Sequence, residues 1–158
     1  MLDVAFSPLV GGHPNGPVMR ITTLYDTGSD LVTIYTRDLE HLDPNNHFPQ
    51  ALGELIPVLT TAGAIRRQAA IGAARLANAN GQGYLGGYFW EDFCIQPDIP
   101  LLDMNGEEVV DANERRMYVD ARLSGAVFRS LFSKGSGKRD SRLVISTIKS
   151  QLQPNLPA

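Results

Sequence analysis

The chain has 158 residues, of which 43% are hydrophobic, and a formal net charge of -3 at pH 7. This length suits one domain with a real core and is short for two. The charge argues against a nucleic-acid partner, because nucleic acids are held by broad basic surfaces. The single cysteine, Cys94, cannot form an internal disulfide, and the three histidines lack partners at zinc-ligand spacing, so we expect no metal site.

The amino terminus has no basic start followed by a long apolar core, so we expect no signal peptide. No stretch of the sequence reaches the roughly 18 consecutive apolar residues that a membrane helix requires. We therefore expect an intracellular protein, in the cytoplasm or the nucleus, that does not associate with a membrane.

The first part of the chain is expected to contain strands, one short helix and the loops between them. A loop rich in turn formers over 11–17 precedes an alternating strand over 18–26. Residues 31–35 are β-branched and aromatic, which favours a second strand. The next segment begins like a helix with an acidic first turn and stops at Pro44.

The middle of the chain carries conflicting signals. Residues 54–61 favour a strand, but the alanine and arginine content of 62–83 favours a helix. Gly63, Gly72 and Gly81 argue against that helix. The residues alone leave this conflict open.

The last third is predicted to be mainly extended. We expect strands over 88–96, 115–125 and 142–152, a turn at Asn105-Gly106 within an excursion over 97–114, a helix over 126–132, a flexible basic loop over 133–141 and a frayed tail. In the strand over 115–125, one face would carry Met117, Val119, Ala121 and Leu123. We expect no internal repeat and a mostly β domain with two short helices.

One motif contains candidate catalytic residues. In the stretch LYDTGSDLVTIY, a strand delivers Asp26 into a tight turn in which Thr27 and Ser29 offer hydroxyls and Gly28 permits close backbone approach. Such an arrangement can hold an ionised carboxylate that is partly desolvated. The alternative is an ordinary turn, since these residue types are all common in turns.

The DTGS string after an apolar strand resembles the active-site signature of aspartic proteases. The stretch RLSGAVFRSLF is similar to a second element of that family, an apolar pair with a glycine and a short helix, which packs beside the active-site loop. Its candidate residues here are Leu123, Ser124 and Gly125. Ser124 stands where an apolar residue is usual, and Ala126 stands where retroviral members often carry an arginine. Arg122 or Arg129 is expected to pair with Asp30 instead.

The resemblance also implies a flap, a hairpin that closes over the substrate. Its candidate residues are Thr61, Ala62, Gly63 and Ala64, and the three small residues, 62–64, would form its tip. This implication resolves the conflict over 62–83 in favour of a hairpin.

The fold that the resemblance implies is a mostly β, retropepsin-like closed barrel with short helices, one lobe per chain and an active site completed by dimerisation. The single domain would span 1–158, with its core over about 18–150 and a flexible tail over 151–158. The motif occurs once, whereas the chemistry needs two carboxylates that share a proton. The resemblance therefore implies a homodimer in which both chains supply Asp26.

The implied function is an aspartic endopeptidase, encoded by a retroelement or derived from one, that cleaves an extended peptide or polyprotein. A water activated between the two Asp26 carboxylates would attack the peptide bond, with Thr27 bonding across the dimer axis and Ser29 donating to Asp26. No metal or organic cofactor is needed. The alternative is an inactive dimerisation or peptide-binding module, in which Ser124 and the excursion over 97–114 mark lost catalysis.

Overall fold

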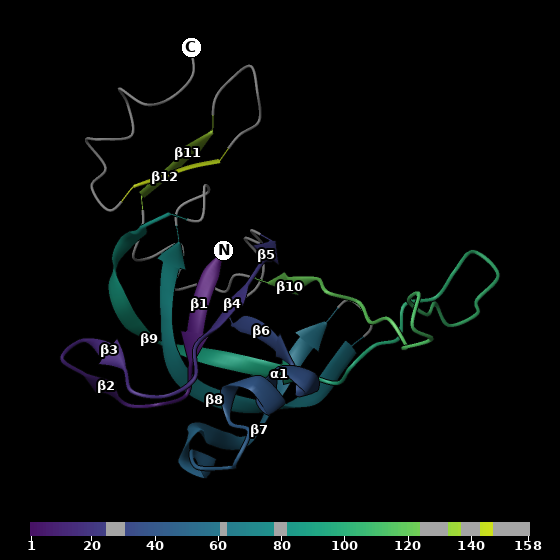
Figure 1. The fold of residues 1–158 in the computed structure, drawn as a ribbon, viewed down its shortest axis with the longest axis horizontal. Helices are drawn as coiled ribbons and strands as arrows, with labels where there is room; N and C mark the ends of the chain where they lie inside the picture. Colours follow the sequence, from purple (N-terminus) through teal and green to yellow (C-terminus); the bar gives the residue numbers. More distant parts are fainter. Residues whose placement is uncertain (25–30, 61–62, 78–81, 124–132, 137–142, 147–158) are drawn as a thin grey trace.

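A six-stranded sheet organises the chain (Figure 1). The structure, a computed structural model, describes residues 1–24, 31–60, 63–77, 82–123, 133–136 and 143–146. Along the sheet the strand order is β4-β1-β8-β9-β6, and β7 also pairs with β8. Its strands are β1 (Leu2–Ala5), β4 (Met19–Ile21), β6 (Val32–Tyr35), β7 (Leu52–Thr60), β8 (Gly63–Ala77) and β9 (Tyr84–Gln96). The prediction of a mostly β chain is confirmed, but this strand order is an open path, and the described residues form no closed barrel.

Three two-stranded pairs and two short helices complete the described elements. The pairs are β2 (Leu9–Val10) with β3 (His13–Pro14), β5 (Thr23–Leu24) with β10 (Arg122–Leu123), and β11 (Ser133–Ser136) with β12 (Leu143–Ser146). The helices are α1 (Thr36–Leu42) and a 3-10 turn, η1 (Pro49–Ala51). Within the described ranges, no helix is long and apolar enough to cross a membrane.

Most elements predicted in the first 100 residues are confirmed. The strand expected over 18–26 is divided at Thr22 into β4 and β5, and the next strand and helix are β6 and α1. The strands expected over 54–61 and 88–96 lie in β7 and β9.

The segment with the conflicting signals is a strand. β8 pairs antiparallel with β1 and β7 along one edge and with β9 along the other. Backbone hydrogen bonds on both sides outweigh the helix propensity of its alanines and arginines. At Gly72 a Cβ atom would lie 2.5 Å from the Ala5 carbonyl oxygen and 2.8 Å from Phe93 Cε2, so a close backbone contact requires glycine there.

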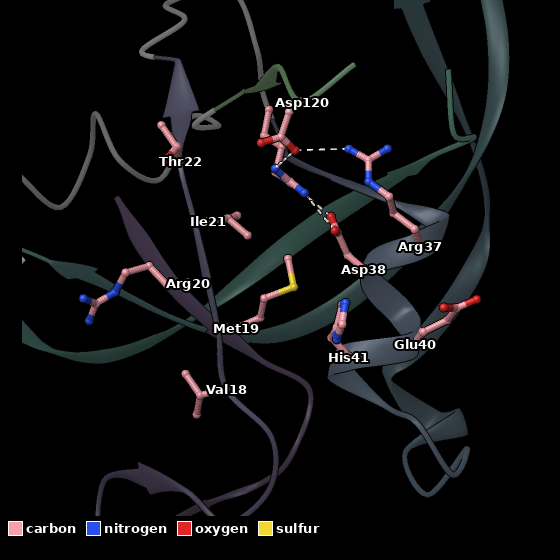
Figure 2. Close-up of a pocket in the computed structure, with 11 residues that line it drawn as sticks. Val18, Met19, Arg20, Ile21, Thr22, Arg37, Asp38, Glu40, His41 and Asp120 are labelled. Atoms are coloured by element: carbon pink, nitrogen blue, oxygen red, sulfur yellow. Dashed lines mark hydrogen bonds and ion pairs between the residues drawn. The ribbon is translucent and has the colours of Figure 1, made fainter. Parts of the chain in front are cut away.

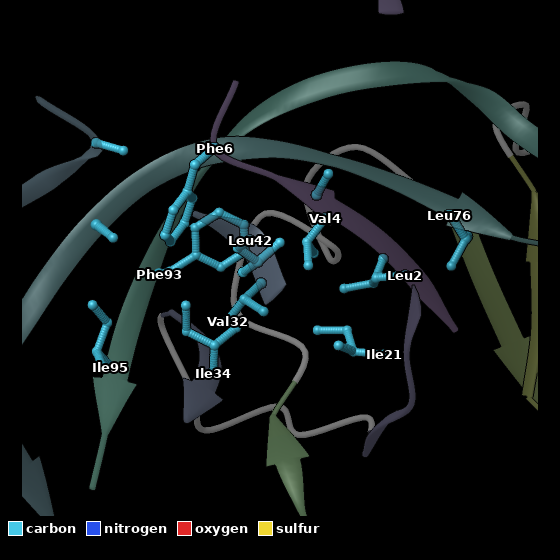
Figure 3. Close-up of a cluster of buried hydrophobic side chains, with 13 residues drawn as sticks. Leu2, Val4, Phe6, Ile21, Val32, Ile34, Leu42, Leu76, Phe93 and Ile95 are labelled. Atoms are coloured by element: carbon cyan, nitrogen blue, oxygen red, sulfur yellow. The ribbon is translucent and has the colours of Figure 1, made fainter. Parts of the chain in front are cut away.

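The core lies against the inner face of the curved sheet (Figure 3). Phe6 and Phe93 meet edge to face, with ring centroids 6.1 Å apart. The other large side chains of the cluster are Leu2, Val4, Ile21, Val32, Ile34, Leu42, Leu76 and Ile95. All four residues of β1 are buried, so the core begins before residue 18.

The strand predicted over 115–125 is largely wrong. In the described part of this range, 115–123, the strand is limited to Arg122 and Leu123, and Met117, one of the four residues predicted to share a face, is 41% exposed. The buried residue is Arg122, which has the opposite parity. Residues 117–119 do not form the predicted strand because their backbone groups make hydrogen bonds to Ile99, Leu101 and Val109 in the preceding excursion and not to the main sheet.

That excursion contains an internal repeat, contrary to expectation. Asp103 Oδ1 accepts hydrogen bonds from the backbone N–H groups of Asn105 and Glu107, and Asp111 Oδ1 accepts them from Asn113 and Arg115. The left-handed positions, Gly106 and Glu114, also correspond. The aspartates stand eight positions apart (103 and 111), so the unit LLDMNGEE is followed by VVDANERR.

Towards the carboxyl terminus the predictions are only partly covered by the described residues. The basic segment expected to be a loop over 133–141 begins as β11, and β12 lies within the strand expected over 142–152. The helix predicted over 126–132 and the tail over 151–158 lie outside the described residues.

Candidate active site

Two short strands bring together the segments that lead into the two motifs. β5 and β10 pair in parallel, with Thr23 opposite Arg122 and Leu24 opposite Leu123. Asp26 follows two residues after Leu24, and Ser124 follows Leu123 directly. The chain therefore enters both motifs from neighbouring strands that run in the same direction.

The predicted site residues are only partly described. Leu123 lies in β10 and is half-buried, and Gly63 and Ala64 are exposed at the start of β8. The remaining candidates, Asp26, Thr27, Gly28, Ser29, Thr61, Ala62, Ser124 and Gly125, lie outside the described residues.

A buried ion pair fixes β10 to the helix that follows the first motif. The guanidinium of Arg122 donates from Nε to Asp38 Oδ2 (3.0 Å) and from Nη2 to Asp38 Oδ1 (2.8 Å). The two side chains are 6% and 3% exposed. Burial lowers the pKa of Arg122, but the hydrogen bonds and charge of Asp38 outweigh it, so the pKa is raised. The Arg122 guanidinium therefore keeps its charge.

Tyr35 joins the same two elements a second time. Its hydroxyl donates to the carbonyl of Ala121 (2.9 Å), and its backbone N–H donates to Asp38 Oδ2 (2.8 Å). Because Tyr35 ends β6 and Asp38 lies in the first turn of α1, these bonds fix the start of the helix. The β6–α1 junction is thus connected to the residues just before the second motif.

Arg37 extends this cluster toward the excursion. It donates to Asp98, to Asp120 and to the carbonyl of Val119, and its guanidinium lies 4.3 Å from the centroid of the Tyr35 ring. Such stacking on an aromatic face adds a cation–π attraction. The base of the excursion is therefore held by one arginine.

A polar pocket of about 650 Å³ opens beside this cluster, between residues 18–22 and the first turns of α1 (Figure 2). Three arginines line it, and each is ion-paired: Arg20 with Asp3, Arg37 with Asp98 and Asp120, and Arg122 with Asp38 and Asp120. The carboxylates neutralise the charge that would attract an anion. We therefore assign no ligand to this pocket.

The predicted flap coincides with a hairpin. β7 and β8 pair antiparallel up to Thr60 opposite Gly63, which leaves a two-residue connection over 61–62. Thr60 Oγ1 donates to the Gly63 carbonyl (2.8 Å), and Gly63 has φ +116°, a conformation that favours glycine. Leu59 beside the tip is 85% exposed. The hairpin therefore presents an apolar side chain to the surroundings.

No protein-family model, no curated protein and no solved structure matches the chain. In the described part of the chain, no cluster of three or more histidine, cysteine, aspartate or glutamate side chains could hold a metal ion.

The ion pair between Arg122 and Asp38 was not predicted from the sequence. In the structure Arg122 pairs with Asp38 and Asp120. The predicted pairing of Asp30 with Arg122 or Arg129 is not tested, because Asp30 and Arg129 lie outside the described residues. A signal was available, because Asp38 stands three residues after a strand end, where a carboxylate caps a helix. Helix capping does not predict that the Asp38 carboxylate also binds Arg122, 84 positions later in the chain.

Proposed function

We propose that the chain is a retropepsin-like aspartic endopeptidase that acts as a homodimer. The observation that carries this proposal is the parallel pairing of β5 with β10, which leads the chain side by side into the DTGS motif and into the Leu123-Ser124-Gly125 motif. An ordinary surface turn at 26–29 would not require a second, distant segment beside its entry strand.

Two further observations support the proposal. The residues after the first motif, β6, are all buried, so the motif is flanked by a strand that is fixed in the core. The β7–β8 hairpin lies between the two motifs in the sequence, which is the position that the resemblance implies for a flap. A rigid support and a cover are both needed for a reaction that activates water beside a bound substrate.

In the proposed mechanism two copies of Asp26 share one proton across a two-fold axis. The ionised carboxylate acts as general base and takes a proton from water, and the resulting nucleophile attacks the peptide carbonyl carbon. The protonated carboxyl donates a hydrogen bond to the carbonyl oxygen. The tetrahedral intermediate then collapses as a proton passes to the leaving nitrogen, and the C–N bond breaks.

The test is peptide cleavage by wild type and by Asp26→Asn. A mixed peptide library is incubated with each protein at acidic to neutral pH, with and without a statine-type inhibitor, and products are read by mass spectrometry. We expect cleavage that is lost in the variant and blocked by the inhibitor. A wild-type dimer that cleaves nothing at any pH would refute the enzyme and favour the inactive peptide-binding module.

A further inference from the structure

The strand that leads into the DTGS motif depends on its single partner strand. In the part of the chain that the structure describes, β5 pairs with β10 and not with a strand of the six-stranded sheet (Figure 1). Thr23 is half-buried and Leu24 is 57% exposed, so burial of side chains contributes little to fixing β5. The chain enters β5 from β4 through Thr22. Beyond that residue, the position of β5 follows the position of β10.

β10 is itself held by side chains that bind two successive residues. The Tyr35 hydroxyl donates a hydrogen bond to the Ala121 carbonyl (2.9 Å), and the Asp38 carboxylate accepts two hydrogen bonds from Arg122 (3.0 and 2.8 Å). Tyr35 ends β6, whose four residues are all buried, and Asp38 lies in the first turn of α1. The β6–α1 junction therefore connects β10, and through it β5, to the core.

The Tyr35 side chain is fixed on several sides. The residue is 3% exposed, and the guanidinium carbons of Arg37 and Arg122 lie 4.3 and 5.4 Å from the centroid of its ring. Burial raises the pKa of Tyr35, so the hydroxyl keeps the proton that it donates to Ala121. The ring and its hydrogen bond therefore hold the Ala121 carbonyl at one position.

We propose that Tyr35 is a positioning residue, which fixes the β10–β5 pair through Ala121 and thereby places the Asp26 carboxylate. Ala121 directly precedes β10, Leu123 of β10 stands opposite Leu24 of β5, and Asp26 follows two residues after Leu24. This inference rests on the proposed function, because Asp26 is its catalytic group. A small displacement of a reacting group lowers the rate of a reaction strongly, even where the substrate still binds.

The test is Tyr35→Phe, which deletes the hydroxyl, retains the ring and leaves no buried charge. The first measurement is amide hydrogen exchange in the full chain, followed residue by residue by NMR. We expect the hydrogen-bonded amides of β5 and β10 to exchange at least about fivefold faster than in wild type, because one of the links that hold β10 is lost. The amides of β1 and β8, in the main sheet, should stay within about twofold of wild type.

The second measurement is the kinetics of peptide cleavage, at a temperature where thermal unfolding shows that wild type and variant are folded. A misplaced Asp26 slows the chemical step while the substrate still binds. We therefore expect kcat to fall at least about fivefold in Tyr35→Phe and KM to stay within about twofold of wild type. A loss of folded protein alone would not produce this result under these conditions.

Tyr118→Phe is the matched control. The Tyr118 ring also lies beside Arg37, with the guanidinium carbon 5.4 Å from its centroid, but its hydroxyl makes no hydrogen bond to the described residues. We expect exchange and cleavage within about twofold of wild type.

Three results would overturn the proposal: unchanged exchange of β5 and β10 in Tyr35→Phe, an equal acceleration in Tyr118→Phe, or a rise in KM with kcat unchanged. A wild type that cleaves no peptide would refute the proposed function. In that case the exchange measurement would still decide whether Tyr35 fixes the β10–β5 pair.

Discussion

Asp38 and Arg122 are 84 positions apart in the chain and form a buried ion pair through two hydrogen bonds of 3.0 and 2.8 Å. The pair connects the first turn of α1 to β10, the strand that leads into the second motif. Together with the bond from the Tyr35 hydroxyl to Ala121, it holds the segments on either side of the candidate site at a fixed separation.

Removing one member of this pair should strongly destabilise the fold. Arg122→Ala leaves the Asp38 carboxylate buried without its partner, and we expect the free energy of unfolding to fall by about 3–5 kcal/mol in urea denaturation. The control is Arg116→Ala, because the Arg116–Glu108 pair is exposed, and its loss should change stability by less than about 1 kcal/mol. Equal, small effects of the two substitutions would show that the buried pair contributes little.

Glu91 should make the stability of the fold depend on pH. Burial raises the pKa of this carboxyl from 4.5 to about 7, and its Oε2 has no hydrogen-bond partner among the described residues. The folded state therefore retains a proton that the unfolded chain releases. This contribution is complete below pH 4.5 and is lost as pH rises to about 7, a change of at most about 3 kcal/mol.

Replacing Glu91 with glutamine should remove that dependence. Glu91→Gln stays neutral, so we expect it to be more stable than wild type at pH 8 and to unfold with a flatter pH profile between pH 4.5 and 7. Asp92→Asn, at the exposed neighbouring position, is the matched control and should keep most of the wild-type slope, because burial raises the pKa of Glu91 more than the charge of Asp92 does. A wild-type stability that rises across this range would contradict the assignment.

A side chain at position 72, where the protein has Gly72, should destabilise the fold. An alanine there would place its Cβ atom against the Ala5 carbonyl and the Phe93 ring, and we expect a loss of about 1–3 kcal/mol of stability. Gly87→Ala is the control, because no atom lies within 4 Å of its added Cβ. Thermal unfolding of both variants measures the difference, and similar melting temperatures would argue against the close contact between β1 and β8.

The sequence predicted the helices and strands better than it predicted which of them pair with one another. The strands over 31–35, 54–61 and 88–96 and the helix before Pro44 were recognisable because period, β-branching and proline act locally. The long strand β8 was ambiguous because its alanines favour a helix, and only its neighbours on both edges decide the matter. The residues alone could not reveal those neighbours.

The errors near Arg122 and in the excursion over 97–114 have a common cause. The alternating pattern predicted a strand over 115–125 with apolar residues on one face, but backbone hydrogen bonds join Met117 to Leu101 and Val109 in the preceding excursion. The repeat at Asp103 and Asp111 was visible in the sequence as two D-x-N turns. Of the candidate site, the sequence predicted the hairpin formed by β7 and β8, but not the Asp38–Arg122 pair that anchors β10. The DTGS motif and the residues Ser124 and Gly125 lie outside the described residues.

Ser29 provides a test of the proposed catalytic carboxylate. A hydrogen bond from its hydroxyl to ionised Asp26 would lower the carboxyl pKa, so Ser29→Ala should raise that pKa and move the pH optimum of peptide cleavage upward. Ser29→Thr keeps a hydroxyl and should retain the wild-type optimum. A Ser29→Ala profile identical to wild type would exclude this role for Ser29.

The most direct test of the central claim is a subunit-mixing experiment with Asp26→Asn. Equal amounts of wild type and variant are exchanged at constant total protein, and cleavage of a fluorogenic peptide is compared with that of wild type alone. If each active site needs one Asp26 from each chain, random pairing leaves about one quarter of the activity. A residual activity of about one half would mean that every wild-type chain works alone, and would contradict a dyad shared between two chains.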